Sequence, residues 1–485
     1  MGLKNAVELE ELARLGKWQS IERAVLVNSK KKLNVSEAIH LAKLARRAYR
    51  LQLTLKILKD YVVKPDGEFD MKAEPEALVE YAICLTMLGA RNSALKILNQ
   101  HKYSSASLHF AWITHYFSTY QYSSAIPHVE KFIELQEDEY MKNVGRLNLC
   151  ACKVTLALDD NLEKELEVLK NTFKKNGHSV LFANASELSA QYFIRNKKWN
   201  LANDNLMIAQ KQLTDKDHLY RLFIDKWYLV KKIHTGDVSV FELQKMLSRS
   251  LTLKSYHSIR DLLFHWGHSR DVKVVDKVYL GTPYEGYRRY IDLFNSNYDY
   301  QAPNEVMWNN NWLKHDYDAE LVVNKSDING VRFSKIEMSL LSALLEDFFE
   351  PKSVVSVFDN IFSDENFHPY YSIKKTYKVI ERFKNKLQTS GLPIELINVD
   401  KKYKLKFNKS VAIQILSPQT HRGSTLAEAQ FLSAFAHQPF SRSDVMSSFN
   451  LTKSTTVRWL NKLIETGKIR RIGEGPGSFY RVNAA

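Results

Sequence analysis

The side chains with the most specific chemistry lie near the C-terminus, where short hydroxyl side chains precede spaced cations. Residues 452–456 read Thr-Lys-Ser-Thr-Thr, and Arg458 and Lys462 follow, four residues apart. Hydroxyl groups and free backbone N–H groups at a helix start can donate to phosphate oxygens, and arginine can also contact a base edge. This pattern predicts a helix that binds nucleic acid. Its candidate contact residues are Lys453, Ser454, Thr455, Thr456, Arg458 and Lys462.

The neighbouring residues predict the elements that would position this helix. Residues 441–465 read as helix, tight turn and helix, and Gly467 ends the second helix. Two strand-like runs, 468–472 and 478–482, are joined by Gly-Glu-Gly-Pro-Gly. This order resembles the DNA-binding half of MarR-like bacterial regulators, which implies a second helix in the major groove and a hairpin along the backbone. The hairpin and the first helix add the candidates Arg442, Lys468, Arg470 and Arg471.

A second stretch, residues 320–407, carries its own pattern of strands and helices. A hairpin over 320–323 and 331–333 is expected to open it, and a hairpin over 394–399 and 402–407 is expected to close it. Three helices are expected between them, at about 335–348, 353–361 and 372–387. Ser334 and the glutamate three residues later predict a capping box for the first helix. The run FSKIEMSLLSALLEDFFEPKSVVSVFDNIF resembles the first two helices of OmpR-type winged helices, which implies a third helix that faces DNA.

By this resemblance, the third helix and the closing hairpin supply a second group of DNA contacts. Lys374, Lys378 and Arg382 are four residues apart and would form one stripe. Lysine is a weaker bidentate reader of guanine than arginine, so this module is expected to contribute phosphate affinity more than base selection. The implied contacts are Lys374, Lys375, Tyr377, Lys378, Arg382, Lys401 and Lys402.

The first ~290 residues predict paired helices that recur along the chain. Residues 76–100 read EALVEYAICLTMLGARNSALKILNQ, a helix ending at Leu-Gly, a turn and a second helix. Similar units cover 107–135, 184–213 and 218–251, with a small residue where the paired helices would touch. These units resemble tetratricopeptide repeats, which implies an α-solenoid with a concave groove for a protein or peptide partner.

The expected fold is therefore mostly α, with an N-terminal α-solenoid followed by two α+β winged-helix domains. The expected boundaries are 1–294 for the repeats, 295–318 for a junction, 319–409 for the first winged helix, 410–425 for a linker and 426–485 for the second winged helix. If both winged helices engage one duplex, the second binding event is intramolecular and avidity rises without new contacts.

Composition favours a polyanionic partner for this chain. The net charge is +15, and residues 366–409 carry 11 Lys/Arg against 3 Asp/Glu, while residues 440–485 carry 8 against 3. The sequence contains no run of 18 apolar residues, so no transmembrane helix is expected. Cys84, Cys150 and Cys152 form no CxxC motif, and we expect reduced core thiols in a cytoplasmic protein.

Motifs for catalysis and cofactor binding are absent from the sequence, which has no GxxxxGK[ST], HExxH or GxSxG. His265, His268 and Asp271 could ligate a metal from one helix face, but satisfied polar side chains at a capped helix end are the favoured interpretation. No catalytic residue, cofactor or metal site is therefore expected.

Two functions from different classes remain open. The first is a DNA-binding transcriptional regulator of the cytoplasm or nucleoid, whose repeats sense or dock a partner while the winged helices bind promoter DNA. A palindromic site would require a homodimer of this regulator. The second is a scaffold in a larger complex, in which repeats and winged helices bind protein; exposed apolar surface on either third helix would favour it. A nucleic-acid enzyme is a weaker third hypothesis, since no acidic metal cluster is visible.

Overall fold

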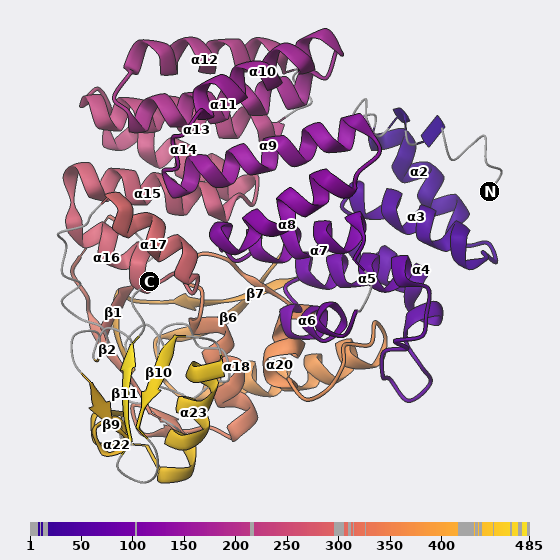
Figure 1. Ribbon diagram of the computed structural model, residues 1–485. Coiled ribbons are helices and arrows are strands. Elements are labelled where there is room, and N and C mark those ends of the chain that lie inside the picture. The colour runs from indigo at the N-terminus through magenta and orange to yellow at the C-terminus, as the bar shows by residue number, and fades with distance from the viewer. Residues whose placement is uncertain are drawn as a thin grey trace.

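The computed structural model shows a mostly helical chain with small sheets in its C-terminal part (Figure 1). None of the helices in the part of the chain described below has the length and apolar character needed to cross a bilayer. The structure describes residues 8–9, 11–12, 18–101, 104–213, 218–294, 305–308, 312–313, 315–324, 326–415, 431, 435, 439–449, 451–465, 468–473 and 478–482.

The N-terminal helices form what we call the helical array, α2 to α17. Figure 1 shows it running from α2 through α9 to α12 and then returning through α15 to α17 toward the sheets. The bounds are α2 Trp18–Asn28, α3 Val35–Arg47, α4 Leu51–Val62, α5 Pro75–Met87, α6 Arg91–Gln100, α7 Ala106–Phe117, α8 Tyr122–Leu135, α9 Glu139–Leu156, α10 Leu162–Lys175, α11 Ser179–Arg195, α12 Trp199–Gln212, α13 His218–Thr235, α14 Val240–Thr252, α15 Tyr256–Arg270, α16 Val272–Leu280 and α17 Glu285–Phe294.

The helix pairs predicted from the sequence are present as α5–α6, α7–α8, α11–α12 and α13–α14. Their small residues Ala94, Ala125 and Ala202 are fully buried, as expected where paired helices touch. Several turns inside pairs share one backbone geometry, in which one residue takes a positive φ and the next donates its N–H to the carbonyl five residues earlier. This is the Schellman ending of a helix. Its positive-φ residues are Tyr49, Gly89, Tyr120, Lys197 and Gly236.

The segment after the array forms the middle region, which contains two sheets and three helices among the described residues. One sheet has the order β1-β8-β2-β3-β4, with β2 parallel to β8, and the other has the order β5-β7-β6. The bounds are β1 Glu305–Trp308, β2 Ala319–Val323, β3 Asp327–Ile328, β4 Val331–Arg332, α18 Lys335–Leu345, β5 Lys352–Ser353, α19 Val354–Ile361, α20 Tyr371–Thr389, β6 Ile394–Val399, β7 Lys402–Phe407 and β8 Val411–Ile415.

The three helices and the closing hairpin of this region are confirmed, as is the capping box. The Ser334 hydroxyl accepts the Glu337 N–H, and the Glu337 carboxylate accepts the Ser334 N–H at 2.7 Å. Four strands of this region, β1, β3, β5 and β8, were not predicted. Because β3 pairs with both β2 and β4, the opening runs 320–323 and 331–333 do not pair directly with each other, contrary to prediction. β1 lies in the segment expected to be a junction and β8 at the start of the expected linker, and they pair with each other, so both segments help to build a sheet.

The C-terminal region follows the predicted order closely. A sheet of order β10-β11-β9 packs with two helices around buried aromatic residues that include Phe431, Phe440 and Tyr480. The predicted helix, turn, helix and hairpin are confirmed. The bounds are β9 Phe440–Ser441, α22 Arg442–Phe449, α23 Lys453–Glu465, β10 Ile469–Ile472 and β11 Phe479–Val482.

The middle region is docked on the array through α19. The Asp359 carboxylate accepts the backbone N–H groups of Asn92 and Ser93 at 2.8 and 2.9 Å, and the Ser93 hydroxyl at 2.6 Å. The Ser353 hydroxyl, at the start of α19, donates to the Leu88 carbonyl at 2.6 Å. The N–H groups at the start of α6 and the carbonyl of Leu88 therefore find their hydrogen-bond partners in the middle region.

The array also contacts itself where the α7–α8 turn meets α17. A Cβ atom on Gly286 would lie 1.9 Å from the Tyr120 carbonyl oxygen, which is far below contact distance. We expect Gly286→Ala to lower the free energy of unfolding by about 2 kcal/mol, because two backbones must move apart. Denaturant unfolding would measure this, with Ser248→Ala on the exposed side of α14 as the control. Equal stability of the two variants would contradict the close approach.

Candidate nucleic-acid interface

The N-terminal end of α23 presents an outward-facing polar surface. Lys453, Ser454 and Arg458 are exposed, and Thr455 is half-buried. The helix start is capped, since the Thr452 hydroxyl accepts the Thr455 N–H at 3.4 Å. An open hollow lies over this surface. It is lined by Thr452, Lys453, Ser454, Val457, Arg458 and Asn461.

Two other candidates on α23 differ from this group. Thr456 is fully buried, and its hydroxyl donates to the Thr452 carbonyl at 3.0 Å. Its side chain therefore stabilises the capped first turn and does not face outward. The prediction that Thr456 contacts nucleic acid is wrong for this reason. The side chain of Lys462 lies outside the described residues, although its backbone is part of α23.

The C-terminal hairpin brings cations together across its strands. Arg470 on β10 lies directly opposite Arg481 on β11, and both side chains are exposed. Like charges in opposed positions cost stability in an isolated hairpin, so an anion between them would relieve repulsion. Arg471, which lies opposite Tyr480, is also exposed. Sequence reasoning missed Arg481, although its alternation with buried Tyr480 was a usable signal.

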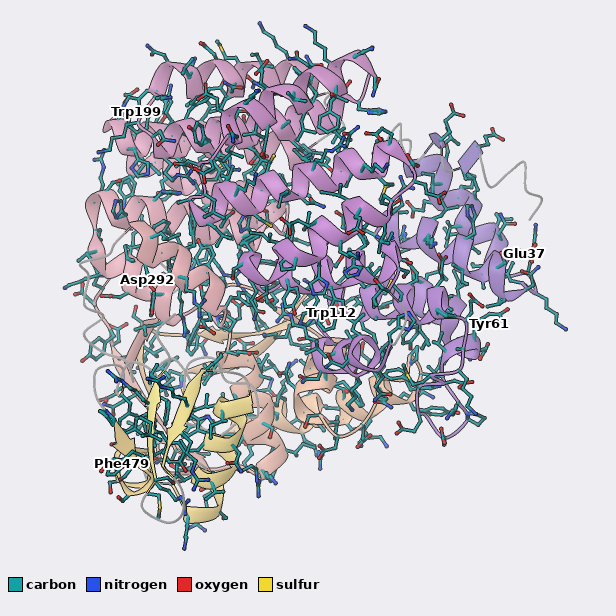
Figure 2. The ribbon with its side chains drawn as sticks, in the orientation of Figure 1. Glu37, Tyr61, Trp112, Trp199, Asp292 and Phe479 are labelled. Carbon is teal, nitrogen blue, oxygen red and sulfur yellow. The ribbon has the colours of Figure 1, made fainter. Side chains whose placement is uncertain are left out.

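An apolar pair lies at the far end of the same hairpin. Ile472 is opposite Phe479, and the two side chains are 42% and 50% exposed. Figure 2 shows Phe479 at the outer side of the C-terminal region. Because the cross-strand register places this pair on the face that carries Arg470 and Arg481, that face is partly basic and partly apolar.

Lys468 and Arg442 are less available than the other C-terminal candidates. The Lys468 ammonium donates to the Glu285 carboxylate on α17 at 3.2 Å, which ties the hairpin to the array. Burial raises the pKa of Glu285, but Lys468 and Arg289 outweigh it and hold the pKa below its ordinary value. Arg442, at the start of α22, is half-buried.

The exposed side of α20 carries the stripe predicted for the third helix of the middle region. Lys374, Lys378 and Arg382 are exposed, and Tyr377 is 45% exposed. The opposite side packs into the core through Thr376, Val379, Ile380 and Phe383. Lys375 is exposed too, but it pairs with Glu365 and lies over the Phe362 ring.

The hairpin formed by β6 and β7 lies against the array. Asp400 at its tip pairs with Lys254 in the α14–α15 turn at 3.1 Å. The Lys402 ammonium lies 3.4 Å from the Glu350 carboxylate and 5.7 Å from the Tyr256 ring centre. Lys401 is exposed at the tip. In this arrangement Lys402 serves a contact between regions, and the hairpin of the middle region is less available than that of the C-terminal region.

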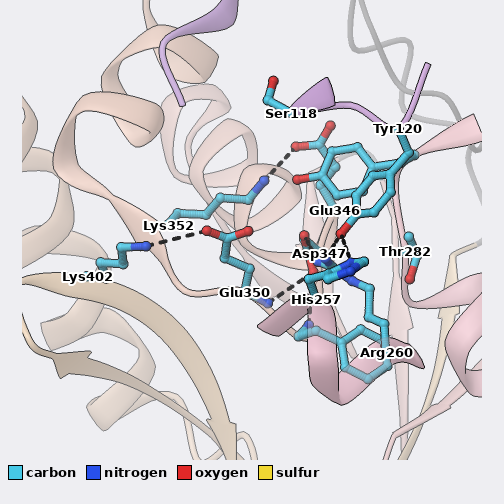
Figure 3. Close-up of polar contacts among 12 residues, drawn as sticks. Ser118, Tyr120, His257, Arg260, Thr282, Glu346, Asp347, Glu350, Lys352 and Lys402 are labelled. Atoms are coloured by element: carbon cyan, nitrogen blue, oxygen red, sulfur yellow. Dashed lines mark hydrogen bonds and ion pairs between the residues drawn. The ribbon is translucent and has the colours of Figure 1, made fainter. Parts of the chain in front are cut away.

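A buried polar cluster joins the middle region to the helical array (Figure 3). Arg260 on α15 forms an ion pair with Asp347, which follows α18, and each side chain is 1% exposed. The Arg260 guanidinium also donates to the Tyr120 hydroxyl at 3.1 Å. Burial raises the pKa of Asp347, but Arg260, Lys352 and the hydrogen bond from the Glu350 N–H together outweigh it and hold the pKa below its ordinary value. Nearby, the Lys352 ammonium donates to Glu346 at 3.0 Å.

The other groups that could do chemistry have structural partners. His265 is hydrogen-bonded to His234 at 3.0 Å, and Asp271 to His315 at 2.7 Å. Within the described ranges no group of three or more His, Cys, Asp or Glu side chains could hold a metal ion. The three cysteines are buried, and burial raises the pKa of Cys150 and of Cys152 to about 12, which disfavours thiolate chemistry.

No protein-family model, curated protein or solved structure matches this chain.

Proposed function

We propose that the protein is a DNA-binding transcriptional regulator. The C-terminal region makes the main duplex contacts, the middle region adds phosphate contacts, and the helical array docks a protein partner. The proposal is supported chiefly by one observation, the outward-facing cations on α23 and its hairpin, Arg458, Arg470 and Arg481. A major-groove helix beside a basic hairpin suits a duplex, because the helix reaches base edges while the hairpin follows phosphates.

The fold supports the resemblances behind this proposal. In both small sheets a short strand just before a helix, β5 or β9, pairs with the second strand of the closing hairpin, as in winged helices. In the array, the shared turn geometry at successive pairs is what stacked repeats of one supersecondary unit would produce. We infer two winged helices and a repeat solenoid, with DNA binding placing the protein in the nucleoid.

The proposal predicts that the affinity for duplex DNA falls steeply with salt concentration, and that the C-terminal cations cause much of this dependence. Each neutralised phosphate contributes about 0.9 to the slope of log affinity against log salt. We expect the variant Arg458→Ala/Arg470→Ala/Arg481→Ala to show a slope shallower by about 3 and weaker binding at all salt concentrations. Fluorescence anisotropy of the full chain on a random-sequence duplex, from about 50 to 300 mM salt, would measure both quantities.

The matched control removes three exposed cations from the array, as Arg23→Ala/Lys174→Ala/Lys175→Ala. It has the same change in net charge, so only position distinguishes the variants. If both variants bind the duplex alike, the attraction is unspecific and the proposed interface is wrong. If the unmodified chain fails to bind at the lowest salt, the proposed function is wrong.

The scaffold remains the second candidate because of specific apolar groups. Ile472 and Phe479 are exposed on the C-terminal hairpin, and Tyr371, 74% exposed, lies at the start of α20. The outer side of α23, in contrast, is polar apart from half-buried Val457. Since α23 is the helix that would meet a partner, this polarity favours DNA over protein for the C-terminal region.

A further inference from the structure

The first turn of α20 lies against a helix of the array. Tyr370, the residue just before α20, has the ammonium groups of Lys56 and Lys59 at 5.6 and 5.3 Å from its ring centre. Both lysines belong to α4, three residues apart, so they share one side of that helix. An aromatic residue of the middle region thus holds two cations of the array at the N-terminal end of α20, the helix proposed to contact DNA.

These lysines continue the cation stripe of α20 across the boundary between regions. Tyr370 precedes Lys374 by four residues, as Lys374 precedes Lys378 and Lys378 precedes Arg382. Residues at this spacing follow one another along a helix surface. The ring of Tyr370 therefore lies next in line, and the α4 ammonium groups lie over that ring. The surface contains cations from two parts of the chain that are more than 300 residues apart in sequence.

The acidic neighbours do not cancel this surface. Lys59 pairs with Asp60, Lys375 pairs with Glu365, and exposed Glu381 lies on α20 itself. Against these three carboxylates stand six cations. They are Lys56, Lys59, Lys374, Lys375, Lys378 and Arg382. A cation held over a ring keeps its N–H donors available on the other side. Lys56 is exposed, and the Lys59 side chain is 21% exposed beside Asp60.

The dimensions favour phosphates as the targets of the α4 lysines. The stripe from Lys374 to Arg382 spans about 12 Å along the helix axis, which is comparable with the width of the major groove. Cations beyond the N-terminal end of such a helix fall outside the groove, where the phosphate strand forms its edge. Lysine suits this position, since it acts as a point charge and needs no fixed orientation.

We propose that α4 of the helical array is part of the DNA footprint, with Lys56 and Lys59 binding phosphates beside the groove that α20 enters. This inference rests on the proposed function, because it names further contacts to the same duplex. It also assigns the array a second role besides docking a protein, and it makes the footprint of the middle region depend on the α4–α20 contact.

The test uses the full chain with the double substitution Lys56→Gln/Lys59→Gln. On a random-sequence duplex the salt slope becomes shallower by about 2, corresponding to two lost phosphate contacts. The variant Lys56→Arg/Lys59→Arg restores the slope, because it keeps both charges. The matched control Lys174→Gln/Lys175→Gln, on the far part of α10, leaves the slope unchanged.

A purely structural role for the two lysines has a different signature. If they only hold Tyr370, the Gln variant loses thermal stability while its salt slope stays that of the unmodified chain, and this result overturns the inference. The proposed function survives that result if Arg458→Ala/Arg470→Ala/Arg481→Ala still flattens the slope. Absence of any duplex binding by the unmodified chain overturns both.

Discussion

Replacing Arg260 by methionine is expected to lower the free energy of unfolding by about 3–5 kcal/mol, the usual cost of leaving one partner of a buried ion pair alone. Asp347 would keep its carboxylate in a site where it is 1% exposed, with the backbone N–H groups of Phe349 and Glu350 as its remaining donors. Urea unfolding followed by circular dichroism would measure the loss. Arg23→Met, an exposed change on α2, provides the control.

The double variant Arg260→Met/Asp347→Asn separates the charge from the packing. An asparagine oxygen can still accept the N–H groups of Phe349 and Glu350, while neither charge of the pair stays buried. Replacing both members of a buried pair is often nearly neutral, so we expect the double variant to recover most of the stability lost in Arg260→Met. A double variant as unstable as the single one would show that the pair is not the source of the effect.

The same pair gives stability a pH dependence of known sign. The folded-state pKa of Asp347 lies below its ordinary value, so the folded state favours the ionised form. The stabilisation is present above the unfolded pKa of about 3.9 and is lost as pH falls through the folded pKa. The stability difference between the unmodified chain and Arg260→Met/Asp347→Asn should therefore shift in favour of the variant as pH falls below about 5. A difference that does not change with pH would contradict this assignment.

Elements with local signals could be predicted from the sequence, whereas contacts between regions could not. Residues 453–465 show helical spacing and a polar start, and α23 has these bounds. The burial of Thr456 was also visible, because it precedes Leu460 and Leu463 by four and seven residues, the period of a buried helix side. Its hydroxyl group suggested a contact with nucleic acid, but its spacing from Leu460 and Leu463 places it on the buried side of the helix.

The missed features depend on partners far away in the chain. Nothing near Asp400 indicates that it meets Lys254, and nothing near Lys402 indicates Tyr256, since the partners are about 146 residues away. The turn at Tyr120 is a related case. A positive φ is ordinary for glycine and costly for tyrosine, and the surrounding rings at Tyr284 and Tyr287 hold Tyr120 there. Tertiary packing, which a single sequence does not encode locally, determined these positions.

Replacing Asp359 by alanine is expected to lower the free energy of unfolding by about 3 kcal/mol. Helix α6 begins after Ala90, which has no side chain able to cap it, and Asp359 accepts the N–H groups of Asn92 and Ser93 in its place. Asp359 is 2% exposed, so water cannot simply replace it. The substitution leaves buried donors unsatisfied at the point where the middle region meets the array, and each such donor costs about 1–3 kcal/mol.

Hydrogen exchange would distinguish loss of this contact between regions from general destabilisation. Asp359→Ala should raise the exchange rates of the Asn92 and Ser93 amides more than those of α11 and α12, which lie elsewhere in the array, whereas Asp160→Ala in an exposed turn should change neither. Burial raises the pKa of Asp359 despite its hydrogen bonds, so the charged carboxylate is retained at a cost. Because Asp359 lies at the contact between α6 and α19, we expect its role to be the stabilisation of that contact. Uniform exchange across the array in Asp359→Ala would contradict this.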